Sequence, residues 1–92
     1  MELWCAIFQD PDQEGVDPGQ VRWIARSLLY AFIGEGPSAD RATTNLLQAV
    51  KAEYEFAKQD GRRPFEGLPQ DPFVIGPQTA KNGRIRFTRF LV

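Results

Sequence analysis

The residues with the most obvious chemical potential are acidic ones near the N-terminus. Asp10, Asp12 and Glu14 fall at alternate positions, and Gly15 follows them. Oxygen ligands at the first, third and fifth positions, with glycine at the sixth, are typical of a calcium-binding loop. The pattern then ends, because the twelfth position, which needs a bidentate glutamate, is Val21, and no helix is expected before the loop. We therefore expect a solvated acidic loop and no metal site.

Arginines gather near the C-terminus, at Arg84, Arg86 and Arg89. Arg84 and Arg86 alternate with Ile85 and Phe87 and share one face of the predicted strand, whereas Arg89 falls on the other face. Such side chains can neutralise phosphates, and arginine interleaved with phenylalanine suits single-stranded nucleic acid. Charged residues also protect an exposed edge strand from aggregation, and they occur in protein contacts. The sequence leaves these alternatives open and marks the three arginines as possible phosphate contacts.

The most unusual segment is the proline-rich loop over residues 61–73. A loop this long is uncommon in so short a chain and is often functional. Its aromatic and arginine side chains are of the types that dominate binding at protein interfaces. The partner-binding residues predicted here are Arg62, Arg63, Phe65, Leu68, Pro69 and Phe73. In the alternative, Phe65 and Phe73 pack onto the helices and the loop is only a connector.

Two further features add to the predicted contacts. If the loop is exposed, Gly67, Leu68 and Pro69 would suit the active site of a prolyl isomerase, which makes such an enzyme a candidate partner at Pro69. Trp23 lies beside an apolar stripe and between two arginines, and we add it to the partner-binding set. Packing of Trp23 under a neighbouring loop is the alternative.

The composition argues against catalysis. The chain has 92 residues, no histidine, one cysteine and a net charge of −1. The commonest general base is therefore missing, and we find no paired carboxylates, nucleophile motif or phosphate-binding glycine loop. Cys5 lies in an apolar segment, where burial raises a thiol pKa, so we expect a structural cysteine. We predict a protein that is not an enzyme and uses no cofactor.

The elements that must position these residues follow from periodicity and capping. The apolar run over residues 3–9 predicts a buried strand. Asp17 as N-cap, Pro18 and apolar residues at helical spacing predict a helix over about residues 18–33. Ser38 caps a second predicted helix over residues 39–59.

The remaining residues complete an α+β fold. Asn82 and Gly83 predict the turn of a C-terminal hairpin over residues 73–92. We predict a single domain over residues 1–92 in the order β-α-α-β-β, with a helical hairpin packed on a small antiparallel sheet and the first strand paired with the last. The alternative is a mainly α fold with an irregular C-terminal hairpin. Without a membrane-spanning stretch or a secretory signal, we expect a cytoplasmic protein with no membrane contact.

A small, near-neutral protein with a helical hairpin and an exposed loop at Gly67, Leu68 and Pro69 resembles the phage-encoded anti-RecBCD proteins of the P22 type. The resemblance covers length, order of elements and that one loop. It implies a phage protein of the host cytoplasm that binds the RecBCD helicase–nuclease at or near its RecC subunit. Such a protein would inhibit or modulate recombination rather than cut DNA. The alternative is a small nucleic-acid-binding or regulatory module that uses the C-terminal arginines.

Overall fold

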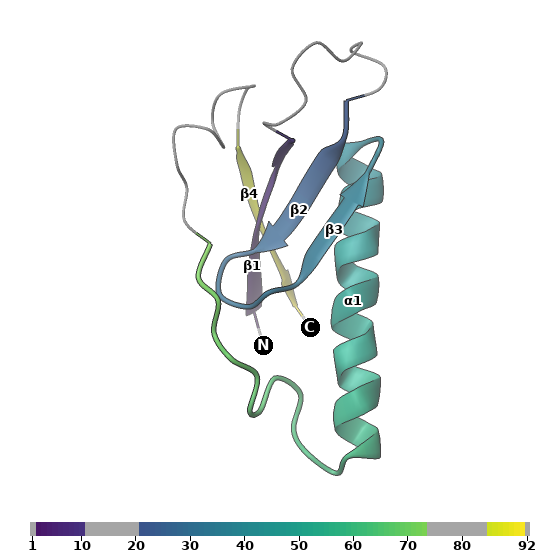
Figure 1. The fold of residues 1–92 in the computed structure, drawn as a ribbon, viewed down its shortest axis with the longest axis vertical. Coiled ribbons are helices and arrows are strands. Elements are labelled where there is room, and N and C mark those ends of the chain that lie inside the picture. The colour runs from purple at the N-terminus through teal and green to yellow at the C-terminus, as the bar shows by residue number, and fades with distance from the viewer. Residues whose placement is uncertain (1, 11–20, 74–84, 92) are drawn as a thin grey trace.

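The computed structural model describes residues 2–10, 21–73 and 85–91. In chain order these form β1 (Glu2–Gln9), β2 (Trp23–Ser27), β3 (Ile33–Gly36), α1 (Ala39–Gln59) and β4 (Arg86–Leu91). The strands make one antiparallel sheet of order β3-β2-β1-β4, and α1 lies against one face of it, mainly beneath β2 and β3 (Figure 1). The predicted α+β class is confirmed.

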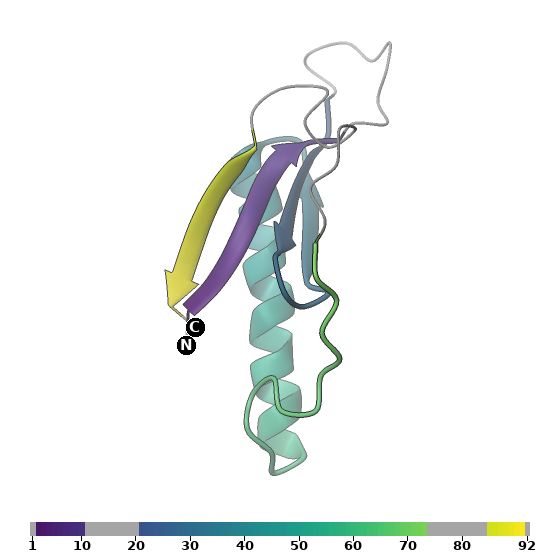
Figure 2. The same cartoon turned by 90° about the vertical axis from the view of Figure 1, so that its left-hand side faces the viewer.

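The two ends of the chain meet in the sheet, as predicted. β1 pairs antiparallel with β4 from Glu2 opposite Leu91 to Ile7 opposite Arg86. Figure 2 shows these two strands side by side, with β4 at the margin of the sheet. The strand predicted over residues 3–9 is therefore correct, and it is central rather than peripheral because β2 occupies its other side.

The helix predicted over residues 18–33 is wrong for the part of it that the structure describes. Residues 23–27 are β2, residues 28–32 form a turn, and β3 begins at Ile33. The helical hairpin and the order β-α-α-β-β are therefore replaced by a β-β-β-α-β order with one helix among the described elements, and the mainly α alternative is also wrong. The predicted cap at Asp17 and Pro18 lies outside the described residues.

The second predicted helix is confirmed at both ends. The Ser38 side chain accepts a hydrogen bond of 3.1 Å from the backbone N–H of Arg41, which satisfies a donor left free at the first turn. The helix ends where Asp60 is followed by Gly61, which has a φ of 68°. Ala42, Leu46 and Val50 form its buried stripe.

The core lies between α1 and the inner face of the sheet. The β1 residues Leu3, Cys5 and Ile7 point toward the helix and are almost completely buried, as expected from the alternation of side chains along a strand. The helix approaches β3 so closely that glycine is required there. A Cβ on Gly34 would lie 2.2 Å from the backbone oxygen of Ala42.

Residues 60–73 run back from the end of α1 along the molecule without regular structure (Figure 1). Phe65 closes the far end of the core, with its ring against Tyr30, Phe32 and Tyr54. Of the predicted hairpin over residues 73–92, the strand β4 is present, and Phe73 is described but is not in a strand. The predicted turn at Asn82 and Gly83 lies outside the described residues.

Candidate functional site

The face of β1 and β4 that is turned away from α1 carries exposed apolar side chains. Alternation places Trp4 on this face of β1, and Phe87 and Leu91 on the same face of β4. Their exposed fractions are 46%, 48% and 84%. Arg89 lies opposite Trp4 in the register and between Phe87 and Leu91 along β4. We call Trp4, Phe87, Arg89 and Leu91 the outer surface.

The same face of the sheet is covered where β1 meets β2. Phe73 stacks on Phe8 with ring centroids 5.5 Å apart, and the guanidinium of Arg26 lies 5.8 Å from the centroid of the Phe73 ring. The backbone N–H groups of Asp71 and Phe73 hold this segment in place by donating to the oxygens of Leu29 and Leu28 at 2.7 and 2.8 Å. Because Phe73 covers Phe8, Phe8 is buried, whereas the side chains of the outer surface are exposed to solvent.

The charge at the centre of the outer surface is neutralised within the chain. Nη1 of Arg89 donates to Oε1 of Glu2 at 3.0 Å, and the guanidinium carbon of Arg89 lies 5.9 Å from the centroid of the Trp4 ring. An arginine over an indole face is a cation–π contact. The outer surface is therefore a nearly neutral apolar area around a paired arginine, rather than a positive one.

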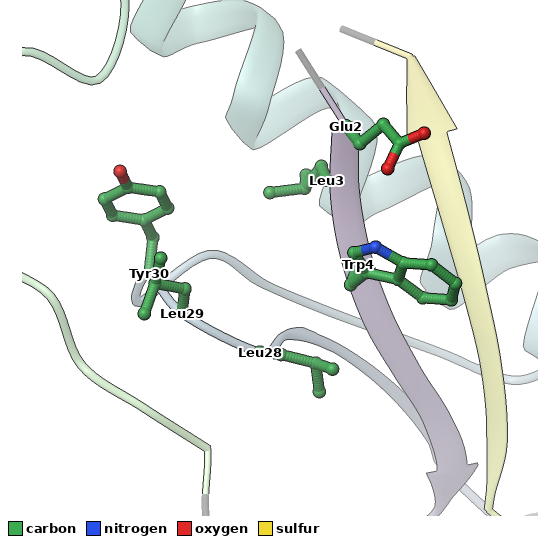
Figure 3. Close-up of a pocket in the computed structure, with 6 residues that line it drawn as sticks. All are labelled: Glu2, Leu3, Trp4, Leu28, Leu29 and Tyr30. Atoms are coloured by element: carbon green, nitrogen blue, oxygen red, sulfur yellow. The ribbon is translucent and has the colours of Figure 1, made fainter.

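A hollow of about 280 Å³ opens beside Trp4. Figure 3 shows Leu3 of β1 directed toward the turn between β2 and β3, whereas the side chains of Glu2 and Trp4 are directed toward β4. That turn contributes Leu28, Leu29 and Tyr30. The turn is fixed because the backbone oxygen of Tyr30 accepts hydrogen bonds from Ser27 Oγ and Arg26 Nη1. The hollow is mostly apolar, and it extends the outer surface toward β2.

The apolar side chains predicted to bind a partner from residues 61–73 mostly pack within the protein itself. Phe65 is only 6% exposed, so it is a core residue, and the alternative in which it packs onto the fold is the one observed. Leu68 is half-buried against the same core. Phe73 is half-buried on Phe8. Arg63 and Pro69 are exposed.

Arg62 is tied to the helix. Its Nη2 lies 2.6 Å from Oε1 of Glu53, a carboxylate that is otherwise buried on α1. That hydrogen bond raises the pKa of Arg62 above its usual value. Arg62 and Pro64 also border a second hollow of about 500 Å³ against α1. The predicted contact residues of this segment therefore reach the surface through Arg63, Pro69 and parts of Arg62 and Leu68.

Trp23 is half-buried and packs against the core from β2, whereas the alternative drawn from the sequence was packing under a neighbouring loop. Its neighbour Arg22 pairs with Asp10 at 2.6 Å and with Glu35 at 3.5 Å. Asp10 is the one residue of the predicted acidic loop that the structure describes, and it is buried.

The predicted phosphate contacts do not share one face. Arg86 and Arg89 are both exposed, but alternation along β4 directs them to opposite faces of the sheet. Arg84 lies outside the described residues. The signal that sequence reasoning underused was Trp4, which alternates with the buried residues Leu3 and Cys5 in β1.

Other chemistry finds little support in the part of the chain that is described. No group of three or more metal-ligating side chains occurs there. Burial raises the pKa of the Cys5 thiol to about 11, so this cysteine is a poor nucleophile, in line with its predicted structural role. No described helix has the length and apolar character needed to cross a membrane.

Comparison of the chain with protein-family models, with curated proteins and with solved structures gave no match. The resemblance to anti-RecBCD proteins therefore stays a prediction. One of the features on which it rested, the helical hairpin, is replaced by strands in the described residues, whereas Gly67 and Pro69 are exposed as expected.

Proposed function

We propose that this chain is a non-enzymatic protein-binding domain that contacts its partner through the outer surface. The observation that carries the proposal is the cluster formed by Trp4, Phe87 and Leu91, three large apolar side chains that share one face and are each close to half exposed or more. Tryptophan and arginine anchors surrounded by apolar contacts are typical of the residues that dominate protein binding. The hollow beside Trp4 offers space for an apolar side chain of the partner.

A protein partner is favoured over nucleic acid because of the charge pattern. Binding to phosphates requires cations that are available to release counterions. Arg89 is paired with Glu2, and Arg26 is paired with Asp71 at 3.1 Å, so two arginines on this side of the sheet are already neutralised. The formal net charge of −1 gives no general attraction to a polyanion either.

The specific partner implied by the sequence resemblance is RecBCD, with the contact at or near RecC. Support for it is limited to chain length and the exposed residues Gly67 and Pro69, which also keep a prolyl isomerase in the proposal as a second partner. A phage modulator of RecBCD would work in the host cytoplasm, and the free, buried thiol of Cys5 suits a reducing compartment.

Single-stranded nucleic acid is the second candidate ligand. One observation favours it, because the exposed rings of Trp4 and Phe87 lie on adjacent strands with Arg89 beside them, and bases stack on such rings. Binding of this kind would require Arg89 to exchange its contact with Glu2 for a phosphate.

Titrations at two salt concentrations separate these candidates. The immobilised protein is exposed to purified RecBCD, and separately to a single-stranded DNA of about twenty nucleotides, at roughly 50 and 200 mM salt. Binding of RecBCD that changes little with salt supports the proposal and its named partner. Binding of the oligonucleotide that weakens steeply with salt supports the second candidate and contradicts the proposal.

A further inference from the structure

Among the described strands, β4 forms one edge of the sheet. The hydrogen bonds between β1 and β2 determine which backbone groups of β4 face outward. The backbone N–H of Leu28 donates to the oxygen of Trp4, and that of Asp10 donates to the oxygen of Arg22, both at 2.9 Å. The even-numbered residues of β1 therefore direct their backbone groups to β2. Backbone groups alternate in direction along a strand, so the odd-numbered residues of β1 face β4.

The register then fixes which groups of β4 are left open. Cys5 lies opposite Thr88, and the two form a hydrogen-bonded pair because Cys5 faces β4. Phe87 and Arg89, on either side of Thr88, direct their N–H and C=O groups away from the sheet. Figure 2 shows no described element beyond β4 on that side. Unpaired groups in such a row are a template for another strand.

On the opposite edge of the sheet, β3, one outward-facing acceptor is already occupied. The backbone N–H of Ser27 donates to the oxygen of Phe32 at 3.0 Å, so alternation turns the backbone groups of Glu35 away from β2. Nδ2 of Asn45 on α1 donates to the oxygen of Glu35 at 2.6 Å. With the oxygen of Glu35 occupied from α1, strand addition is favoured at β4 rather than at β3.

We propose that β4 pairs antiparallel with β4 of a second copy of this chain, in the register that places Thr88 opposite the partner's Thr88. The second copy is favoured as the occupant because the strand is complementary to itself in this register. Phe87 then lies opposite the partner's Arg89, and Arg86 lies opposite the partner's Phe90. Each arginine meets an aromatic ring, and no two arginines are directly opposite one another.

Cross-strand neighbours of this kind are favourable in antiparallel sheets. Directly opposite side chains have Cβ atoms about 4.5–5.5 Å apart, and threonine pairs stabilise such contacts. Arginine over an aromatic ring adds a cation–π attraction. Phe87 and the partner's Arg89 also form hydrogen-bonded pairs at both symmetric positions, because their backbone groups face outward.

Neighbouring registers are less suitable. A shift centred on Arg89 places this residue opposite its own copy, and a shift centred on Arg86 does the same there. Like charges directly opposite one another are destabilising. A register centred on Phe87 pairs only Arg86, Phe87 and Thr88 within the strand bounds of Arg86–Leu91. The register centred on Thr88 pairs residues 86–90 without apposing arginines.

In the proposed dimer the four described strands of each chain join in one continuous sheet of eight. A twofold axis perpendicular to the sheet keeps both outer surfaces on the same side. The two Trp4 side chains and their hollows then flank a central strip of Phe87 and Arg89. The pairing goes beyond the proposed function, because it requires only this chain and does not depend on any binding partner.

The first test is the molar mass of the purified protein by analytical ultracentrifugation from about 5 to 500 µM. The expected result is a monomer at the lowest concentration and a mass that approaches twice the monomer value at the highest. Phe87→Lys places two lysines opposite the partner's Arg89 residues and is expected to remain monomeric throughout. Leu91→Lys, on the same face of β4 but beyond the paired residues, is the matched control and is expected to dimerise.

The second test reads the register by disulfide formation. In a Cys5→Ala background, Thr88→Cys brings two thiols together at a non-hydrogen-bonded pair, where Cα atoms are about 4.5 Å apart. Arg86→Cys is the control, because the two introduced thiols would lie about 13 Å apart along the strands. Rapid cross-linking at position 88 and slow cross-linking at 86 are expected, with circular dichroism to establish that both variants are folded.

Three results would overturn the proposal. The first is a monomer mass for wild-type protein up to 500 µM. The second is dimerisation of Phe87→Lys as strong as that of the wild type. The third is cross-linking of Arg86→Cys at the rate of Thr88→Cys. All are measured on the isolated protein, so they leave the separate question of a binding partner to its own experiment.

Discussion

The guanidinium of Arg89 lies over the indole of Trp4, with the guanidinium carbon 5.9 Å from the ring centroid, while Nη1 of the same arginine binds Glu2 at 3.0 Å. One side chain thus neutralises a carboxylate and partly covers an exposed tryptophan. Both contacts connect β4 to β1 across the face of the sheet that α1 does not cover. Together they produce a surface that is apolar and nearly neutral although an arginine lies at its centre.

Removal of this arginine should expose Trp4 without unfolding the sheet. Arg89→Ala loses an exposed ion pair and a cation–π contact, which together stabilise a folded protein by about 0.5–1 kcal/mol. In a Trp23→Phe background, iodide should quench the fluorescence of Trp4 more strongly in Arg89→Ala than in the parent. Arg86→Ala, on the other face of β4, is the control. Equal quenching in all three proteins would show that Arg89 does not cover Trp4.

Gly34 should be intolerant of any side chain. A Cβ there would lie 2.2 Å from the oxygen of Ala42 and 2.3 Å from the nitrogen of Leu46, and both are backbone atoms of α1 that cannot turn aside. Gly34→Ala should lower the free energy of unfolding by about 3 kcal/mol, because the helix must move away from β3. Urea unfolding measures this change. Ile33→Ala, at a half-exposed neighbouring position, should change it by much less.

Phe65→Ala should destabilise the protein strongly. The ring contacts Tyr30, Phe32 and Tyr54, with centroid separations of 5.4–5.6 Å, and truncation of a buried phenylalanine costs about 3–5 kcal/mol. The partner-binding role that the sequence suggested for Phe65 would instead leave the domain folded and weaken only binding. Pro69→Ala, at an exposed position of the same segment, is the control. A thermal melt of Phe65→Ala that matches the control would contradict the core role.

The stability of the protein should fall at alkaline pH because of Cys5. Burial raises the pKa of its thiol from 9.0 to about 11. Above pH 9 the unfolded chain releases this proton first, so the folded state binds more protons. The stabilisation is therefore complete below pH 9 and is lost as the pH rises toward 11. Between pH 8 and pH 10 the loss due to Cys5 should be about 1 kcal/mol.

Urea unfolding of the wild type and of Cys5→Ala at these two pH values isolates this contribution. The variant is expected to be less stable at pH 8 and to lose less stability than the wild type on going to pH 10. Parallel losses in the two proteins would show that another group causes the pH dependence.

Part of the fold could be predicted because local signals and tertiary packing agree there. Ser38 caps α1, the buried stripe of the helix has the helical period, and the apolar run in β1 has no such period. The predicted pairing of β1 with β4 is confirmed by the register, although it rested on the expected order of elements and not on a local signal. The burial predicted for Cys5 is observed, because the cysteine lies within the buried apolar run of β1.

The sequence did not indicate the strand β2, because its alternation of buried and exposed residues is not visible as an alternation of apolar and polar residues. Small residues occupy one face, and a segment distant in the sequence covers the other. On the face of β2 toward the helix, the buried positions are Ala25 and Ser27, which do not look like a hydrophobic stripe. On the other face, the charged Arg26 is covered by Phe73, which is far away in the sequence. A run of apolar residues through the following turn then produced a false helical period.

The outer surface was missed for a related reason. Its members come from the two ends of the chain, and only the register brings Trp4 beside Arg89. Sequence reasoning instead favoured residues 61–73, where long irregular stretches and aromatic residues suggest contact. Phe65 in that segment is not exposed to a partner, because its side chain fills the end of the core.

The most direct test of the account is affinity capture with three forms of the protein from the same bacterial lysate: the wild type, Trp4→Ser and Phe56→Ser. Phe56 is 61% exposed on α1 and lies far from the outer surface in sequence and on another element, so it controls for the loss of any exposed aromatic residue. Mass spectrometry identifies what each form retains, and thermal melts establish that all three are folded. Binding through the outer surface predicts that the wild type and Phe56→Ser retain proteins that Trp4→Ser loses. Retention of the same proteins by Trp4→Ser and by the wild type would contradict it.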